Sequence, residues 1–223
     1  MTTKATLIEQ ICGQDIKSEV EITTANGKSR IKLTSDCPKL PLFANKLTEL
    51  EFDRMQVYNL GLYDLWLIAR SCGLKPYCPV PTIILNAIWL ENGMVAESLA
   101  NKSITRIFLD PSKSSERKKT RIKIEQPLCG YVAFVKANSI SPQKVEISII
   151  TPCSKIRQYL KKEVEGKPFR SFEDCERVIG EAKRITASCF IPVAVSIAYG
   201  IETKAIKVAS KDRPILEMTF SKS

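Results

Sequence analysis

The sequence CPVPTIILNAIWLE, residues 78–91, places a cysteine and two prolines directly before an apolar run. A similar arrangement, CFIPVAVSIAYGIE, occupies residues 189–202 near the end of the chain. Proline is favoured in the first turn of a helix, so each stretch predicts a helix that begins just after its cysteine. Both helices are apolar on nearly all sides, which predicts that each is buried at the centre of a folded unit.

Two further pairs of cysteines occupy corresponding places in the two halves of the chain. Cys12 and Cys129 each precede a glycine and an alternating stretch that is typical of strands. Cys37 and Cys153 each follow the end of such a stretch. The separations are similar, with 37 − 12 = 25 residues in the first half and 153 − 129 = 24 in the second. Because an internal repeat sets the whole architecture, the sequence predicts a tandem duplication.

The expected fold class is α+β, with two similar units that pack together around a pseudo-twofold axis. In each unit we expect a β-hairpin, then helices, then a last strand. Alternating apolar residues indicate hairpins at 19–33 and 131–150, and last strands at 103–108 and 214–219. Helical periodicity is found at 38–50, 62–71, 79–91, 154–165, 171–184 and 191–202.

Charge is distributed unevenly along the chain, whose net charge is +10. Residues 1–110 hold twelve Lys and Arg against twelve Asp and Glu, whereas residues 111–223 hold twenty-two against twelve. Six of the cations lie in PSKSSERKKTRIK, residues 111–123, a composition typical of a solvated linker. We therefore expect a first unit at 1–110, a basic linker at 111–123 and a second unit at 124–223.

The amino-acid composition restricts the chemistry that this chain can perform. The chain has eight cysteines and no histidine. The lack of histidine excludes imidazole ligands and Ser-His or Cys-His catalytic pairs. The N-terminus lacks a signal-peptide pattern and no apolar run reaches the length of a membrane span, so we expect a cytoplasmic protein outside the membrane. In that reducing compartment, cysteines indicate metal binding, redox chemistry or catalysis rather than disulfides.

Cys37 and Cys78 each precede a proline, which predicts that both stand at helix N-termini. Backbone N–H groups there favour the thiolate, which is the form that binds iron or zinc. An all-thiolate set suits an iron–sulfur cluster, with zinc as the alternative metal. The rival interpretation is that the cysteines are small buried core residues. The candidate metal ligands are Cys12, Cys37, Cys72 and Cys78 in the first unit, and Cys129, Cys153, Cys175 and Cys189 in the second.

Three ordered features resemble a family of short, uncharacterised cysteine-containing proteins of anaerobic bacteria and methanogenic archaea. They are I11-C12-G13, SDCP at 35–38 and CxxxxxCPVPxxIxxAIxxE at 72–91. The resemblance covers residues 6–110, and the second half looks like a degenerate copy. It implies an anaerobic host and cysteines that matter for function, and it brings no established activity.

Three functions are open at this point. The leading one is an iron–sulfur or other thiolate-ligated metal-cluster protein of anaerobic metabolism, which acts as an electron carrier, a cluster scaffold or a small subunit of an enzyme complex. The second is a basic module that binds nucleic acid or a protein through the second half, with structural cysteines. The third is a cysteine-dependent enzyme, for which no motif identifies a catalytic residue or a substrate.

Overall fold

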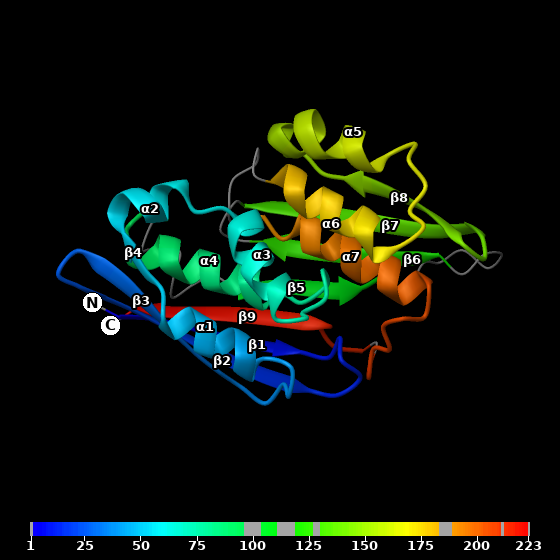
Figure 1. The fold of residues 1–223 in the computed structure, drawn as a ribbon. Helices are drawn as coiled ribbons and strands as arrows, with labels where there is room; N and C mark the ends of the chain where they lie inside the picture. The colour runs from blue at the N-terminus through cyan, green and yellow to red at the C-terminus, as the bar shows by residue number, and fades with distance from the viewer. Residues whose placement is uncertain are drawn as a thin grey trace.

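Antiparallel strands form one sheet that runs through both halves of the chain (Figure 1). The computed structural model describes residues 2–95, 104–110, 119–126, 130–182, 189–210 and 212–222. Within these residues, nine strands lie in the order β4-β3-β2-β1-β9-β5-β6-β7-β8. The strands are β1 (Thr2–Glu9), β2 (Ile16–Ala25), β3 (Lys28–Ser35), β4 (Glu51–Asp53), β5 (Ile104–Leu109), β6 (Thr120–Gln126), β7 (Tyr131–Ser141), β8 (Lys144–Ile150) and β9 (Leu216–Lys222).

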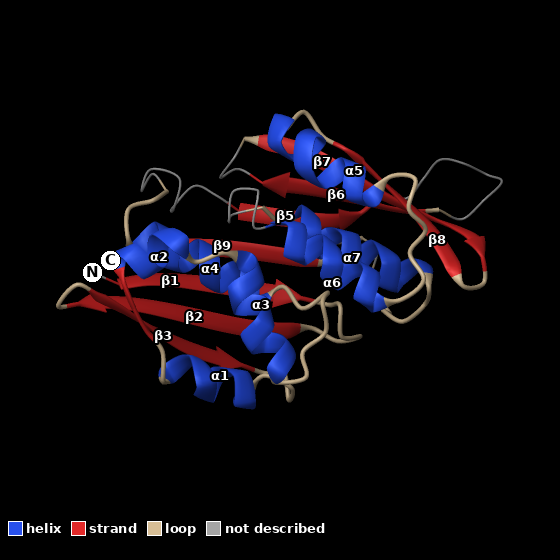
Figure 2. Cartoon of the chain, turned by 45° about the horizontal axis from the view of Figure 1, so that its top comes forward, coloured by secondary structure: helices blue, strands red, loops and turns tan. Residues whose placement is uncertain are grey.

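The helices that the structure describes lie on one side of this sheet (Figure 2). The first unit has α1 (Pro41–Thr48), α2 (Arg54–Asn59), α3 (Leu62–Ser71) and α4 (Val80–Glu91). The second unit has a π-helical turn η2 (Ile156–Leu160), α5 (Lys161–Val164), α6 (Phe172–Glu181) and α7 (Ile191–Glu202). The α+β class and the two similar units are therefore confirmed.

The two apolar helices are the centre of the core, as their sequences predict. Every residue of α4 except Trp89 is buried, and α7 is buried from Ile191 to Gly200. Helix α4 packs on β1 and β2, whereas α7 packs on β6 and β7. Burying one large aliphatic side chain contributes about 1.5–3 kcal/mol, so each of these helices makes a large contribution to the hydrophobic stabilisation.

The last strand of each unit is exchanged between the units. Strand β5 ends the first unit but pairs with β6, the first strand of the second unit. Strand β9 ends the second unit but pairs with β1. Because β5 and β9 also pair with each other, the two units interlock in one sheet rather than standing as separate domains.

A pseudo-twofold axis passes between β5 and β9. Arg106 pairs with Glu217 at its centre, with Arg106 Nε 2.8 Å from Glu217 Oε2. On one side of this centre Ile107 pairs with Leu216, and on the other side Thr105 pairs with Met218. The alignment of the two halves matches one of these pairs with the other.

A hydrogen bond to a glutamate recurs at corresponding positions of the two units. Thr3 Oγ1 donates to Glu91 Oε2 at 2.7 Å, and Thr120 Oγ1 donates to Glu202 Oε2 at 2.7 Å. In the second unit the backbone N–H groups of Thr120 and Ser139 also donate to Glu202, at 3.1 and 3.0 Å. Each glutamate thus joins the C-terminal end of the central helix to the first strand of its own unit.

The structure adds elements that the sequence analysis did not predict, namely β1, β4, β6 and α2. Strand β6 begins at Thr120, so the expected linker at 111–123 is shorter at its C-terminal end. Residues 111–118 of that linker lie outside the described part of the chain. Among the described residues, no helix has the length and apolar character needed to cross a membrane.

Candidate functional site

One small cavity in the first unit is lined by three cysteines. Cys12 follows β1, Cys37 follows β3 and Cys78 precedes α4, so segments that are distant in the sequence bring the thiols to one place. The cavity has a volume of about 30 Å³, which is room for one or two water molecules. We call it the thiol pocket. Its other polar lining residues are Glu9, Lys39, Lys75 and Tyr77.

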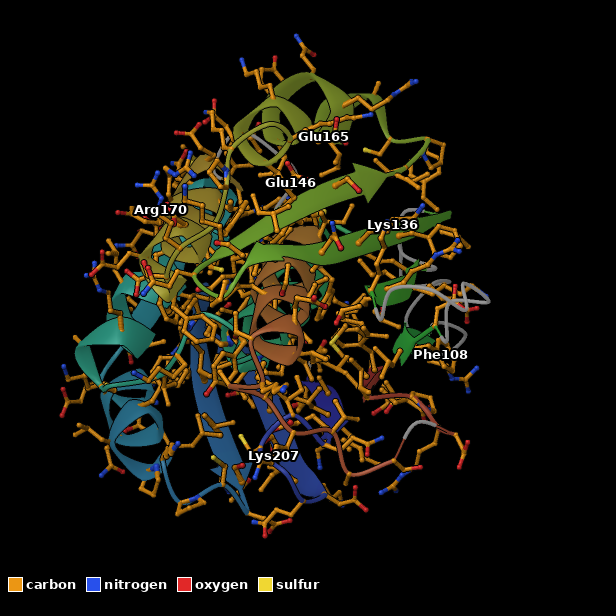
Figure 3. The ribbon with its side chains drawn as sticks, turned by 90° about the vertical axis from the view of Figure 1, so that its right-hand side faces the viewer. Phe108, Lys136, Glu146, Glu165, Arg170 and Lys207 are labelled. Atoms are coloured by element: carbon orange, nitrogen blue, oxygen red, sulfur yellow. The ribbon has the colours of Figure 1, made fainter. Side chains whose placement is uncertain are left out.

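The second unit reaches the wall of the thiol pocket at two points. Lys207, which follows α7, forms an isolated β-bridge with Cys12 (Figure 3). The ring of Tyr77 packs against the ring of Phe172 at the start of α6, with centroids 5.3 Å apart. The pocket therefore belongs to the first unit but lies beside the second.

The turns that carry Cys37 and Cys78 differ in their relation to the following helix. The Cys78 N–H donates to the Lys75 carbonyl at 2.9 Å, and α4 begins two residues later, as its prolines predict. Cys37 instead occupies a turn in which its carbonyl accepts from the Leu40 N–H at 3.1 Å, and α1 begins at Pro41. The prediction that Cys37 stands at a helix N-terminus was therefore wrong, because Pro41 rather than Pro38 starts the helix.

Glu9 is the acidic residue of the thiol pocket and was not identified from the sequence. Its side chain points to the helix-covered side of β1, is only 6 % exposed, and accepts a hydrogen bond from the Ile11 N–H at 2.6 Å. Burial raises the pKa of this carboxyl, while hydrogen bonds from Ile11 and Cys12 lower it less. A polar residue on the apolar face of a strand was the available signal, but β1 itself was not predicted.

Two of the pocket thiols are held in their protonated form. Although part of Cys12 is exposed, desolvation of its sulfur and the charge of Glu9 raise its pKa to about 12. Burial also raises the pKa of Cys78, and the backbone N–H of Val80 offsets this only in part. The helix N-terminus therefore does not make Cys78 a thiolate at neutral pH, contrary to the expectation from the sequence.

Cys72 and Cys175, the two cysteines without a counterpart in the other unit, lie apart from the cysteine sites. Cys72 is the C-terminal cap of α3, does not line the thiol pocket, and its sulfur is 4.0 Å from Ser71 Oγ. Cys175 is buried in α6, and its sulfur interacts with the Ser196 hydroxyl of α7. Burial raises the pKa of Cys175. Packing between helices accounts for the position of Cys175.

The second unit has a different set of residues where the first has the thiol pocket. Cys153 and Cys189 are partly buried at the positions of Cys37 and Cys78, and Cys129 lies outside the described residues. Gln126 takes the place of Glu9, and its Oε1 accepts from the Phe190 N–H at 3.4 Å. The carboxylate is thus absent from the second copy.

The structure does not bring all four candidate ligands of the first unit together. Three of them line the thiol pocket. Across the described ranges, which omit Cys129, no three Cys, Asp or Glu side chains are already arranged to hold a metal ion. Metal binding in the thiol pocket therefore requires the side chains to turn toward a common centre.

Comparison with known proteins identifies the family of the chain. Residues 3–104 and 120–211 each match the family of unknown function DUF6951, and the chain belongs to this family. The two matched segments coincide with the two units, in agreement with a tandem duplication. The match gives no support to the resemblance with short cysteine-containing proteins of anaerobes. No curated protein and no solved structure matches the chain.

Proposed function

We propose that the first unit binds one thiophilic metal ion, such as zinc, in the thiol pocket. The observation that carries this proposal is the convergence of three thiols and the buried Glu9 on one cavity. Zinc is bound by cysteine sulfur and carboxylate oxygen, most often with four ligands in a tetrahedron. Cys12, Cys37 and Cys78 supply three sulfurs, and a carboxylate oxygen of Glu9 supplies the fourth ligand.

The size of the cavity favours a single ion over a cluster. A volume of about 30 Å³ is room for one or two water molecules. One metal ion fits this space, whereas several irons with their sulfides need a larger opening of the surrounding turns. We therefore place an iron–sulfur cluster second, as the rival form of a thiolate-bound metal.

Protonation of the thiols bears on both metal binding and thiol catalysis. A metal ion binds the thiolate, so it must displace the protons of Cys12 and Cys78. The same protonation disfavours a cysteine-dependent enzyme, because a nucleophilic cysteine needs a lowered pKa. These raised pKa values therefore fit a metal ligand that ionises on binding better than a free nucleophile.

The test is the metal content of protein purified without oxygen and with reduced thiols. Zinc, copper, iron and acid-labile sulfide are measured for the original protein, Cys78→Ser and Cys189→Ser. Cys189→Ser is the matched control, because Cys189 occupies the place of Cys78 in the unit that lacks the carboxylate.

We expect about one metal ion per chain in the original protein and in Cys189→Ser, and loss of the ion in Cys78→Ser. Iron with an equal amount of sulfide would support the cluster instead. Equal metal content in all three proteins would remove the thiol pocket as the site.

A further inference from the structure

The second side of the sheet carries none of the described helices (Figures 1 and 2). Burial alternates along the strands, so every second side chain of β6 and β7 points away from the core. We call this side, which no described helix covers, the bare side. The two halves of the sheet differ in the side chains that they carry there.

In the half of the sheet formed by the exchanged strand β5 and the second unit's β6, β7 and β8, large apolar side chains and a lysine form a row across the bare side. The strand registers pair Ile150 with Phe134, Phe134 with Lys123, and Lys123 with Phe108. We call these four residues the aromatic row. Phe108 and Phe134 are each partly exposed, and Figure 3 shows Phe108 on the side away from α6.

Cations surround the aromatic row. The Arg121 guanidinium lies 4.2 Å from the centroid of the Phe134 ring, and Lys123 Nζ lies 6.0 Å from the centroid of Phe108. Arg121 also pairs with Asp110 at 3.2 Å, and Lys123 pairs with Glu125 at 2.5 Å. Lys136, the cross-strand neighbour of Arg121, makes no ion pair within the described part of the chain.

A surface cavity of about 430 Å³ adjoins the aromatic row over β7 and β8. Cavities that bind small organic groups measure roughly 300–1,000 Å³. Lys136 belongs to the cavity wall and points to the bare side (Figure 3). The polar side chains that line the cavity are Lys119, Lys136, Asn138, Glu146, Ser148 and Glu165.

The first unit shows that the sheet does not need aromatic side chains at these positions. The four residues that correspond to the aromatic row are joined by the same cross-strand pairs, and all are polar: Thr34, Glu19, Thr6 and Thr219. The partly exposed phenylalanines on β5 and β7 therefore point to a partner rather than to a requirement of folding.

We infer that the bare side of the second unit binds single-stranded nucleic acid. Bases stack on the rings of Phe134 and Phe108, which stand two strands, or ~10 Å, apart. Lys123, which belongs to the row, and Lys136 and Lys119 beside it are placed to contact backbone phosphates. The excess charge of residues 111–223, twenty-two cations against twelve acids, favours the same polyanion. A second copy of this chain would bring the same cations face to face and is disfavoured.

The experiment measures fluorescence anisotropy of labelled twelve-nucleotide probes, oligo(U) and oligo(dT), with the full-length reduced protein at 50 and 200 mM salt. A duplex of equal length is the competitor. The variants are Phe134→Ala, Phe108→Thr and Lys136→Ala, each checked by circular dichroism. Lys32→Ala is the control, since it removes one charge from the same side of the sheet in the first unit.

We expect binding of at least one single strand, weakened roughly 5- to 150-fold by Phe134→Ala, because stacking of one base is lost. Lys136→Ala replaces a partly exposed side chain on the bare side and should keep the sheet intact. It should lower the salt dependence of log affinity by about 0.7. Lys32→Ala should change the affinity less than twofold. The inference is overturned by the absence of binding at 50 mM salt, by equal binding of the duplex, or by equal losses in Lys136→Ala and Lys32→Ala. Self-association that Phe134→Ala abolishes would also overturn it, in favour of a dimer.

Discussion

The two units repeat one backbone but carry their distinctive side chains on opposite sides of the sheet. The first unit gathers thiols and Glu9 on the helix-covered side, in a cavity of about 30 Å³. The second replaces Glu9 by Gln126, and its half of the sheet carries two partly exposed phenylalanines on the bare side, Phe134 of its own β7 and Phe108 of the exchanged β5. Because both units keep the same strands and central helix, their difference shows that the fold tolerates two different sets of side chains, and that function must be argued from those side chains.

The largest expected effect is a difference in pH dependence between zinc binding in the thiol pocket and oligonucleotide binding on the bare side. Each ion that binds must displace at least the protons of Cys12 and Cys78, so zinc affinity should rise by at least about 100-fold per pH unit between pH 6 and 8. Lysine and arginine stay charged throughout this range, so oligonucleotide affinity should change little. A chromophoric chelator measures the first affinity and anisotropy the second. Zinc affinity that is independent of pH would contradict protonated ligands.

Replacing Glu9 by Gln gives the first unit the residue type that the second unit has at the corresponding position, Gln126. We expect Glu9→Gln to lower zinc affinity by about 10- to 100-fold, because the carboxylate oxygen is lost from the site. The fold should not suffer, since burial raises the pKa of Glu9 and a neutral amide avoids the cost of a buried charge. Calorimetric titration together with thermal unfolding measures both quantities. An unchanged affinity would show that Glu9 is not a ligand.

The smallest effect concerns the paired glutamates at the ends of α4 and α7. Glu202 accepts three hydrogen bonds, so Glu202→Gln should cost about 1–2 kcal/mol of folding free energy at pH 7. Glu91 accepts from Thr3, and its Oε1 has no partner in the described structure, so Glu91→Gln should cost less. Urea unfolding measures both, and equal costs would contradict this comparison.

The same pair gives an expectation for acid. Burial raises the pKa of Glu202, but hydrogen bonds from Thr120 and Ser139 outweigh it and lower the folded pKa below 4.5. A carboxyl with a lowered pKa stabilises the fold above its unfolded pKa and loses this contribution as pH falls through the folded value. The stability difference between the original protein and Glu202→Gln should therefore shrink below about pH 4.5.

Local patterns were enough to predict the central helices, the hairpins and the last strands. Helix α4 was expected at 79–91 and α7 at 191–202, because proline starts each helix and the apolar run continues to a glutamate. Strand β1 was missed because TTKATLIE holds few apolar residues, and Glu9 was missed with it. The exchange of β5 and β9 could not be predicted either. Both strands have the same alternation of apolar residues, so by pattern each could pair with β1 or with β6.

Part of the site could also be predicted from the sequence. The alignment of the two halves identified Cys12, Cys37 and Cys78 as one group, and the structure places them around one cavity. Cys72 and Cys175 were also included among the candidate ligands, but neither lines the thiol pocket, because the packing of α3 and α6 decides where a helical side chain points. Basic charge in residues 119–123 was attributed to a linker, whereas Arg121 and Lys123 belong to a strand.

The central claim is that one unit, and not both, holds a metal ion. Cobalt, which replaces zinc and absorbs visible light when bound by thiolates, is titrated into the reduced, metal-free protein. We predict that absorption saturates at about one cobalt per chain, disappears in Cys78→Ser and persists in Cys189→Ser. Two ions per chain, no thiolate absorption, or equal loss in both variants would contradict the account.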